Sequence, residues 1–154
     1  MPLLVQNKKA NFDYELLDKY EAGLVLFGYE VKALRDGQGS LKGAFISIRT
    51  KEGKTALYLL NAQIPPYKHA GKIIDYNDRR ERKLLLKKEE IDRLLGKMQV
   101  EGLTLIPLRI YTNHSFLKLE FALARGKKKY DKRESIKTRD VERRLRSLTK
   151  RRQQ

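Results

Sequence analysis

The feature that most limits how this chain can fold is its basic C-terminal segment, residues 126–154. This segment contains thirteen Lys and Arg residues against four Asp and Glu residues, so it carries nine of the sixteen net positive charges of the chain. It has too few apolar residues to offset, by burying surface, the entropy that ordering would cost. We therefore expect a compact domain from residues 1–125, followed by a basic tail, residues 126–154, that is disordered when free.

The charge of the tail indicates a polyanionic partner, and the long, regular polyanions of a cell are nucleic acids. Val141, Leu145 and Leu148 have helical spacing and form a thin apolar stripe among basic side chains. This pattern predicts a tail that becomes helical on binding RNA, although so narrow a stripe also arises by chance. The other interpretation is a solvated tail that only keeps the protein soluble. The basic residues around the stripe are Arg143, Arg144, Arg146, Lys150, Arg151 and Arg152.

Composition and motifs exclude several classes of function. The chain has no cysteine, which excludes disulfide bonds, thiolate nucleophiles and cysteine zinc sites. His69 and His114 lack partners at metal-binding spacing, and no phosphate-binding or serine-nucleophile motif occurs. We therefore predict no metal, no cofactor and no enzymatic activity. The sequence has neither a signal peptide nor an apolar run that approaches the length of a membrane span, so we expect a soluble cytoplasmic protein.

Alternating apolar residues predict a mainly β domain. Phe12, Tyr14 and Leu16 share one face of the first strand, and Gly23 within the second strand indicates a bulge or a bend. Short strands with glycine-marked bends are typical of a small closed antiparallel barrel of the oligonucleotide-binding type, which we expect to carry about three helices. The expected strands are residues 12–16, 20–27, 44–49, 56–60, 103–111 and 116–124, with Pro107 near a sheet edge or a bulge.

Two segments of the domain have helical patterns. Residues 30–36 precede Gly37, which suits the C-terminal cap of a short helix. A longer helix is predicted from the acidic pair Glu89 and Glu90 onward, with Gly102 beyond its end. The apolar residues of this helix recur at positions i, i+3, i+4 and i+7, namely Ile91, Leu94, Leu95 and Met98.

The last two strands predict a surface suited to RNA. If residues 112–115 form a four-residue turn, Tyr111 lies opposite Phe116, Arg109 lies opposite Lys118, and all four side chains share one face. Opposed like charges destabilise a sheet unless an anion lies across them, and aromatic rings beside cations suit bases and phosphates. Alternatively, both basic side chains simply extend into solvent. In this register Pro107 opposes Glu120, and the core-facing residues are Leu117, Leu119, Phe121 and Leu123.

Five short strings occur along the chain, the first of which leads into Tyr14. They are Asn7-Lys8-Lys9-Ala10, Tyr20-Glu21-Ala22-Gly23, Gly28-Tyr29-Glu30-Val31-Lys32, Arg82-Lys83-Leu84-Leu85-Leu86 and Gly126-Lys127-Lys128-Lys129-Tyr130-Asp131-Lys132-Arg133. Their order and spacing resemble the small protein B family, the transfer-messenger-RNA-binding proteins of bacterial trans-translation. The resemblance runs from about Asn7 to the end of the chain, and its specificity comes from the series of strings rather than from any single one.

This resemblance implies a non-enzymatic RNA-binding adaptor. The barrel would hold the tRNA-like domain of transfer-messenger RNA and bring this RNA to the A site of stalled ribosomes. The tail would enter the decoding centre and the empty messenger channel, so that the nascent peptide is tagged and the ribosome is released. Elongation factor Tu and alanyl-tRNA synthetase would belong to the same complex, and we expect the protein to be a monomer that does not bind membranes.

The resemblance also implies individual site residues. Glu21, Leu85 and Lys118 match positions that the family uses for RNA binding, and Lys118 is reached from the hairpin register as well. The predicted barrel surface further includes Tyr14, Arg82, Lys83, Arg109 and Phe116. In the tail, Asp131, Lys132 and Arg133 match the family signature, which is needed for accommodation on the ribosome rather than for RNA capture. The predicted tail residues are Gly126, Lys127, Lys128, Lys129, Tyr130, Asp131, Lys132, Arg133, Arg143, Arg144, Arg146, Lys150 and Arg151.

One string departs from the family pattern. The family usually has a His-Asp/Glu-Pro string before the position of Arg82, whereas this chain has Tyr76-Asn77-Asp78 and no proline. The resemblance therefore assigns no RNA contact to the loop of residues 70–80. Two other hypotheses remain open: a general RNA chaperone or ribosome-associated structural protein that binds by charge, and an RNA-processing enzyme.

Overall fold

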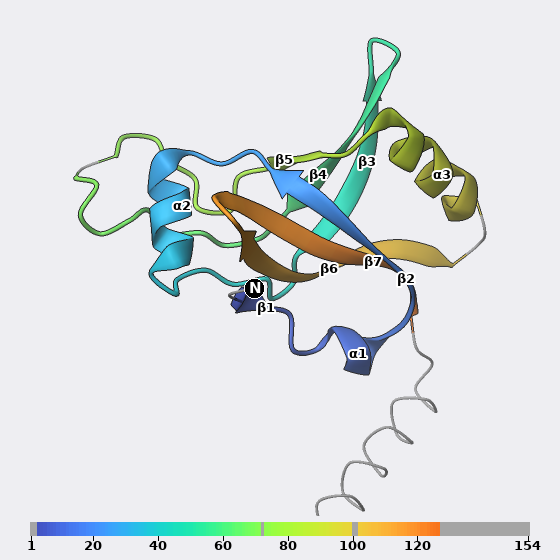
Figure 1. The fold of residues 1–154 in the computed structure, drawn as a ribbon, viewed down its shortest axis with the longest axis horizontal. Helices are drawn as coiled ribbons and strands as arrows, with labels where there is room; N and C mark the ends of the chain where they lie inside the picture. Colours follow the sequence, from blue (N-terminus) through green and yellow to red (C-terminus); the bar gives the residue numbers. More distant parts are fainter. Residues whose placement is uncertain (1–2, 72, 100–101, 127–154) are drawn as a thin grey trace, which may run out of the picture.

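The fold is built on one antiparallel sheet of seven strands in the order β1-β6-β7-β2-β5-β4-β3 (Figure 1). This computed structural model describes residues 3–71, 73–99 and 102–126. The strands are β1 (Leu3–Gln6), β2 (Tyr14–Leu24), β3 (Phe45–Lys51), β4 (Lys54–Leu60), β5 (Arg82–Leu85), β6 (Leu103–Asn113) and β7 (Phe116–Gly126). The helices are α1 (Ala10–Asp13), α2 (Gly28–Arg35) and α3 (Lys88–Met98). The predicted mainly β class with three helices is confirmed for this part of the chain, whereas the tail predictions from Lys127 onward lie outside the described residues.

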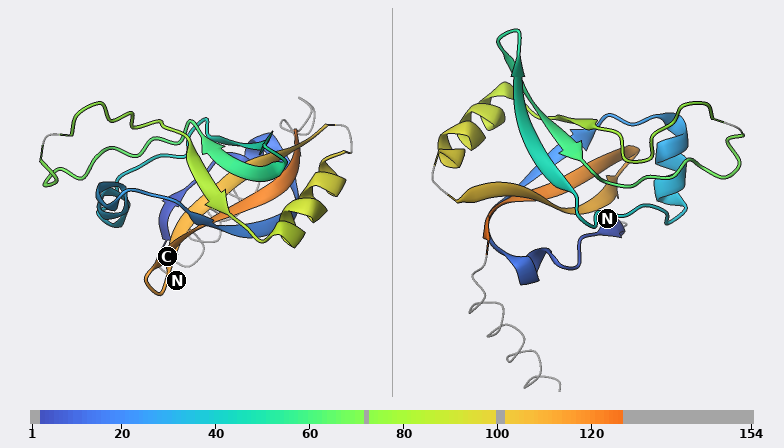
Figure 2. Two further views of the ribbon diagram at one scale, coloured as in Figure 1. Left: turned by 90° about the horizontal axis from the view of Figure 1, so that it is seen from above. Right: turned by 180° about the vertical axis from the view of Figure 1, so that it is seen from behind.

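The sheet curls strongly but does not close into a barrel (Figure 2). β3 contacts β6 across the core, yet within the described residues no hydrogen-bonded ladder joins β3 to β6 or to β1. The short strand β1 instead pairs with β6 at Arg109, Ile110 and Tyr111, and so occupies the edge at which closure would occur. The expected closed barrel is therefore corrected to an open, curled sheet.

Strand β2 takes the place of two predicted strands, residues 12–16 and 20–27. Phe12 lies in α1, so the strand begins at Tyr14 and continues without interruption to Leu24. The bulge expected at Gly23 lies between Leu16 and Asp18 instead. Gly23 itself is paired with a strand on each side, which a bulged residue would not be.

Helices α2 and α3 form where the sequence predicts them. Their apolar sides contribute Ala33 and Leu34 from α2, and Ile91 and Leu94 from α3, to the main core. Gly37 follows α2 with a φ of +80°, and its N–H donates to the carbonyl oxygen of Leu34 at 3.0 Å. This positive φ is the conformation expected for a glycine that ends a helix.

The turn of the last hairpin is shorter than predicted. Asn113 pairs with Phe116, which leaves two residues in the turn instead of four. His114 adopts a φ of 57°, the left-handed conformation that two-residue hairpin turns require. Tyr111 therefore faces Lys118 rather than Phe116, so the predicted register is wrong by two residues. Because side chains alternate with a period of two, this shift leaves the predicted face unchanged.

Strand β6 contains the bulge that Pro107 predicted. The register shifts between Pro107 and Arg109, and Pro107 pairs with Phe121. Asn7 holds this irregular backbone: its N–H donates to the carbonyl oxygen of Leu108 at 2.7 Å, and its Nδ2 donates to that of Pro107 at 2.9 Å. The first sequence string thus stabilises the sheet at a point where ladder hydrogen bonds are interrupted.

A buried ion pair fixes β5 against α2. Glu30 and Arg82 are both fully buried, and Arg82 donates to Glu30 Oε2 from Nε at 2.9 Å and from Nη2 at 2.7 Å. Arg82 Nη1 also donates to the carbonyl oxygen of Ala62 at 2.6 Å. Burial by itself raises the pKa of Glu30, but hydrogen bonds from Arg80, the Phe27 N–H and Arg82 outweigh it and leave the pKa below its ordinary value.

Candidate nucleic-acid interface

Gly23 is the centre of the candidate site because β2 pairs there with two strands at once. Gly23 lies opposite Lys118 of β7 and opposite Leu85 of β5. Directly opposed residues of a sheet point to the same face, and Glu21, two positions earlier in β2, shares that face. The sheet thereby brings Glu21, Leu85 and Lys118 together, although they come from three separate parts of the sequence.

The lack of a side chain at Gly23 keeps this surface open. A Cβ placed on Gly23 would lie 3.3 Å from the Cβ of Leu85, which is closer than ordinary van der Waals contact. Two grooves adjoin at this point: one of about 600 Å³, which includes Glu21 and Lys87, and one of about 410 Å³, which includes Phe116. Gly23, Leu85 and Lys118 line both grooves. We call this surface, formed by Glu21, Gly23, Leu85, Phe116 and Lys118, the Gly23 face.

Two large apolar side chains of the Gly23 face are exposed. Leu85 retains 55% and Phe116 retains 69% of its accessible surface. Exposed apolar side chains beside a basic residue provide contact area for unstacked bases. Side chains along β5 and β7 point alternately to the two faces of the sheet. Leu85 and Phe116 are therefore exposed, because their neighbours Leu84 and Leu117 point into the core.

The carboxylate of Glu21 is held by a residue two strands away. The hydroxyl of Tyr111 on β6 donates a hydrogen bond to Glu21 Oε2 on β2, across the intervening strand β7. Burial, the hydrogen bond to Glu21 and the charge of Glu21 raise the pKa of Tyr111 above its ordinary value, so the phenol stays protonated. The exposed carboxylate of Glu21 thus has a defined orientation and a second oxygen that can accept a hydrogen bond.

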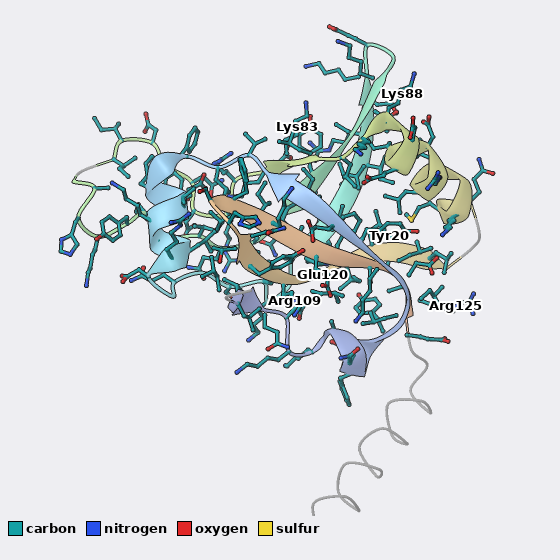
Figure 3. The ribbon with its side chains drawn as sticks, in the orientation of Figure 1. Tyr20, Lys83, Lys88, Arg109, Glu120 and Arg125 are labelled. Carbon is teal, nitrogen blue, oxygen red and sulfur yellow. The ribbon has the colours of Figure 1, made fainter. Side chains whose placement is uncertain are left out.

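Arg109 does not oppose Lys118, which corrects the predicted pair of like charges. Arg109 lies opposite Glu120 and donates to Glu120 Oε2 from Nε at 3.1 Å and from Nη2 at 2.8 Å (Figure 3). Its guanidinium also lies over the ring of Tyr111, 5.4 Å from the centroid. Glu120 and Glu21 are directly opposed in the β2–β7 register, and each has its own partner, Arg109 and Tyr111 respectively. Arg109 therefore compensates a carboxylate beside the site instead of offering a free cation.

Lys118 supplies the positive charge of the Gly23 face. It is half-buried between Tyr111 and Gly23, its partners on the two neighbouring strands. None of the ion pairs found among residues 3–71, 73–99 and 102–126 involves Lys118. Its ammonium group is thus available to an external anion.

Arg82 and Lys83 have different surroundings although they are adjacent. Arg82 was expected to bind RNA, but its side chain is fully buried on Glu30, so this prediction is corrected. Lys83 is exposed on the outer face of β5 together with Leu85 (Figure 3). The period of two along a strand separates them, since Arg82 and Leu84 point inward while Lys83 and Leu85 point outward.

Tyr14 lies away from the Gly23 face. It begins β2 opposite Gly126, at the other end of the strand, and packs against a small apolar cluster that includes Ala10 and Ile106. Tyr14 also lines a separate groove of about 540 Å³ with basic residues from the first string, of which Lys8 is one. The structure therefore does not bring Tyr14 together with Glu21, Leu85 and Lys118.

Sequence reasoning missed the role of two residues. The sequence pattern predicts a bulge or a bend at Gly23, whereas Gly23 is the position at which three strands meet. Tyr111 was placed on the correct face but was not recognised as the partner of Glu21, because the two are ninety positions apart. The signal for Gly23 was its place beside Glu21 in one string, since a glycine inside a strand often marks a close approach of another group.

The described part of the chain contains no group of three or more His, Asp or Glu residues that could hold a metal ion. No helix in that part is long and apolar enough to cross a membrane. The Gly23 face itself offers a carboxylate acceptor, a lysine and exposed apolar side chains.

Comparison with known proteins identifies the family. The family model described as SmpB protein matches residues 4–151. The chain is 49% identical to an SsrA-binding protein of Syntrophobacter fumaroxidans over 99% of this chain and 91% of the relative. It is 48% identical to one of Fervidobacterium nodosum over 97% of this chain and 98% of the relative. The name of these relatives denotes a binding protein and not an enzyme.

A solved structure supports the same assignment. The chain is similar to a protein in the structure described as "tmRNA-SmpB: a journey to the center of the bacterial ribosome", with a TM-score of 0.66 and 45% identity. The match covers 88% of this chain and 95% of the solved one. Since the family model spans nearly the whole chain and the relatives match it over almost their full length, the chain belongs to the SmpB protein family and is a binding protein, not an enzyme.

Proposed function

We propose that this protein is an RNA-binding adaptor of trans-translation. Its Gly23 face binds the tRNA-like domain of transfer-messenger RNA and brings this RNA to the A site of stalled ribosomes. The main support is the convergence of Glu21, Leu85 and Lys118 on one side of the sheet around Gly23. Relatives with 48% and 49% identity are named for binding SsrA, and the similar solved chain comes from a structure described with transfer-messenger RNA and the bacterial ribosome.

The chemistry of the Gly23 face suits folded RNA. The carboxylate of Glu21 accepts hydrogen bonds from base amino or imino groups or from a ribose 2′-hydroxyl, and Lys118 binds a phosphate. Leu85 and Phe116 contact bases that are exposed where the RNA leaves regular helical stacking. A carboxylate at the centre of an RNA-binding surface repels phosphates, so it favours an RNA fold that presents donors at that point. This argues for recognition of a particular RNA shape over binding by charge alone.

The basic tail, residues 126–154, has a separate task in this proposal. It enters the decoding centre and the empty messenger channel of the ribosome and becomes helical there, so that the nascent peptide is tagged and the ribosome is released. Its net charge of nine suits a channel lined by RNA phosphates. The protein acts as a monomer in the cytoplasm, in a complex that also contains elongation factor Tu and alanyl-tRNA synthetase.

The decisive measurement is competitive binding of transfer-messenger RNA against bulk tRNA over a series of salt concentrations. We expect tighter binding of transfer-messenger RNA at every salt concentration, because shape recognition does not vanish when phosphate contacts are screened. Equal binding of both RNAs at matched salt would instead support the alternative, a general RNA chaperone or ribosome-associated structural protein that binds by charge.

A truncated chain tests whether the domain and the tail have separate functions. A protein that ends at Gly126 retains the whole described sheet, so it should bind transfer-messenger RNA but fail to support tagging of stalled peptides. Loss of RNA binding together with tagging would contradict the two-part proposal.

A further inference from the structure

A further groove adjoins the Gly23 face at Leu85 of β5. It has a volume of about 540 Å³ and lies between the β3–β4 hairpin, β5 and the start of α3. Three lysines line it, one from each of these elements: Lys54, Lys83 and Lys88. We call it the lysine groove. Leu85 lines both the lysine groove and the Gly23 face, so the two surfaces are continuous.

The backbone positions these lysines independently of one another. Lys83 points outward because it alternates with the buried residues Arg82 and Leu84. Lys54 begins β4, directly after the tight turn of the hairpin, and Lys88 is the first residue of α3. Figure 3 labels Lys83 on β5 and Lys88 at the start of α3, and both residues line the groove.

The lysine groove carries an excess of positive charge. All three lysines are exposed, and none takes part in the ion pairs found among the described residues. Asp92 is the one acidic residue that lines the groove. On nearby surfaces the cations are compensated: Arg49 pairs with Glu81, and Lys97 pairs with Asp18. Like charges gathered around one groove repel each other, and an anionic ligand relieves this repulsion.

We infer that the lysine groove binds the sugar-phosphate backbone of the same RNA, beyond the nucleotides that contact the Gly23 face. This inference rests on the proposed function, since it takes RNA at the Gly23 face as its starting point. Lysine ammonium groups act as point charges without the paired geometry of arginine, so the groove adds affinity and orientation but no base specificity. Leu85 is the boundary at which base contacts end and backbone contacts begin.

The test compares two double variants of the full chain. Lys54→Ala/Lys88→Ala removes two lysines of the groove, and Lys32→Ala/Lys68→Ala removes two exposed lysines at α2 and the segment that follows β4. The slope of log K against log salt for transfer-messenger RNA should decrease by about 1.4 to 1.8 in the first variant, since each phosphate contact contributes roughly 0.7 to 0.9. The second variant should retain the wild-type slope. Equal slopes for the two variants would overturn the inference.

Backbone footprinting gives a second, independent readout. Hydroxyl-radical cleavage of bound transfer-messenger RNA should show a protected segment that disappears in Lys54→Ala/Lys88→Ala and persists in Leu85→Ala. If the groove variant leaves every protected segment intact, the inference is wrong even when its affinity falls.

The outcome also separates the inference from the proposed function. If Lys118→Ala weakens RNA binding while the groove variant behaves like its control, RNA binding at the Gly23 face is supported and only RNA binding at the lysine groove is excluded. If the wild-type protein shows no preference for transfer-messenger RNA over bulk tRNA, the proposed function fails, and the salt slopes then report a groove for RNA of any kind.

Discussion

The hydroxyl of Tyr111 donates a hydrogen bond to the carboxylate of Glu21, which joins β6 to β2 across the strand between them. Only 4% of Tyr111 is exposed, so its phenol is a fixed donor, while Glu21 is exposed. The interaction places a charged acceptor at the centre of the Gly23 face without taking Glu21 out of solvent. A buried tyrosine of β6 thus sets the geometry of the proposed binding surface.

Replacement of Tyr111 by phenylalanine should weaken RNA binding more than it weakens the fold. Removal of the hydroxyl leaves the ring in place but frees the Glu21 carboxylate, so we expect a loss of affinity for transfer-messenger RNA of about fivefold to tenfold, or roughly 1 to 1.4 kcal/mol. Tyr67→Phe is the matched control, because it removes a hydroxyl away from the Gly23 face. Unchanged RNA affinity in Tyr111→Phe would show that the orientation of Glu21 does not matter.

Replacement of Gly23 by alanine should partly close the Gly23 face. The new Cβ would lie 3.3 Å from the Cβ of Leu85 and would force that side chain to shift by a few tenths of an ångström. We expect a several-fold loss of RNA affinity, measured by titration, with little change in the temperature of unfolding. Gly96→Ala is the control, because nothing lies within 4 Å of its Cβ and alanine favours the helix by roughly 1 kcal/mol. Comparable RNA affinities for the two variants would argue against a close fit at Gly23.

The buried ion pair predicts a large effect on stability. Glu30→Gln leaves Arg82 buried without a counter-charge, so the free energy of unfolding should fall by about 3 to 5 kcal/mol, measured by urea denaturation. Asp18→Asn, which breaks the exposed pair with Lys97, should cost at most about 1 kcal/mol. The double variant Glu30→Met/Arg82→Met should recover much of the loss, because no fully buried charge then remains and Arg80, the second partner of Glu30, is only partly buried. A small cost for Glu30→Gln would mean that water reaches Arg82.

Alkaline pH should destabilise the fold through Tyr76. Burial and the hydrogen bond to Glu30 raise the pKa of Tyr76 to about 12, against about 10 in the unfolded chain. The neutral phenol is the bound form, so its contribution to stability is complete below pH of about 10 and is lost as the pH rises towards about 12. Titration of tyrosinate absorbance should show a late step, to which Tyr111 also contributes, that loses part of its height in Tyr76→Phe but not in Tyr67→Phe. A late step that persists in Tyr76→Phe at full height would assign it to other tyrosines.

Local sequence patterns correctly predicted those helices and strands whose conformation depends on residues close together in the chain. The period of two in β7 and the helical spacing of Ile91 and Leu94 in α3 predict which side chains are buried. Gly37 and Pro107 predict a helix end and a bulge, because backbone conformation limits where these two residues fit. Such constraints act within a few residues of the chain.

Those local patterns could not predict which residues pair when they lie far apart in the sequence. The burial of Arg82 depends on Glu30, fifty-two positions earlier, so a run of basic residues did not reveal which member points inward. The register of the last hairpin depends on the positive φ of His114, a conformation that few residues other than glycine adopt. The edge of β6 at Arg109 to Tyr111 pairs with β1 and not with β3, a pairing between opposite ends of the described chain.

The sequence by itself determined the basic tail and the mainly β class, and it predicts Glu21, Leu85 and Lys118 as RNA-binding residues, since charge, periodicity and family strings are properties of the chain alone. Only the tertiary structure decided that these residues meet at Gly23, that Tyr111 orients Glu21, and that Arg109 is compensated by Glu120. The physical reason is that strand register and side-chain burial depend on partners far away in the sequence, and these are chosen by the packing of the whole sheet.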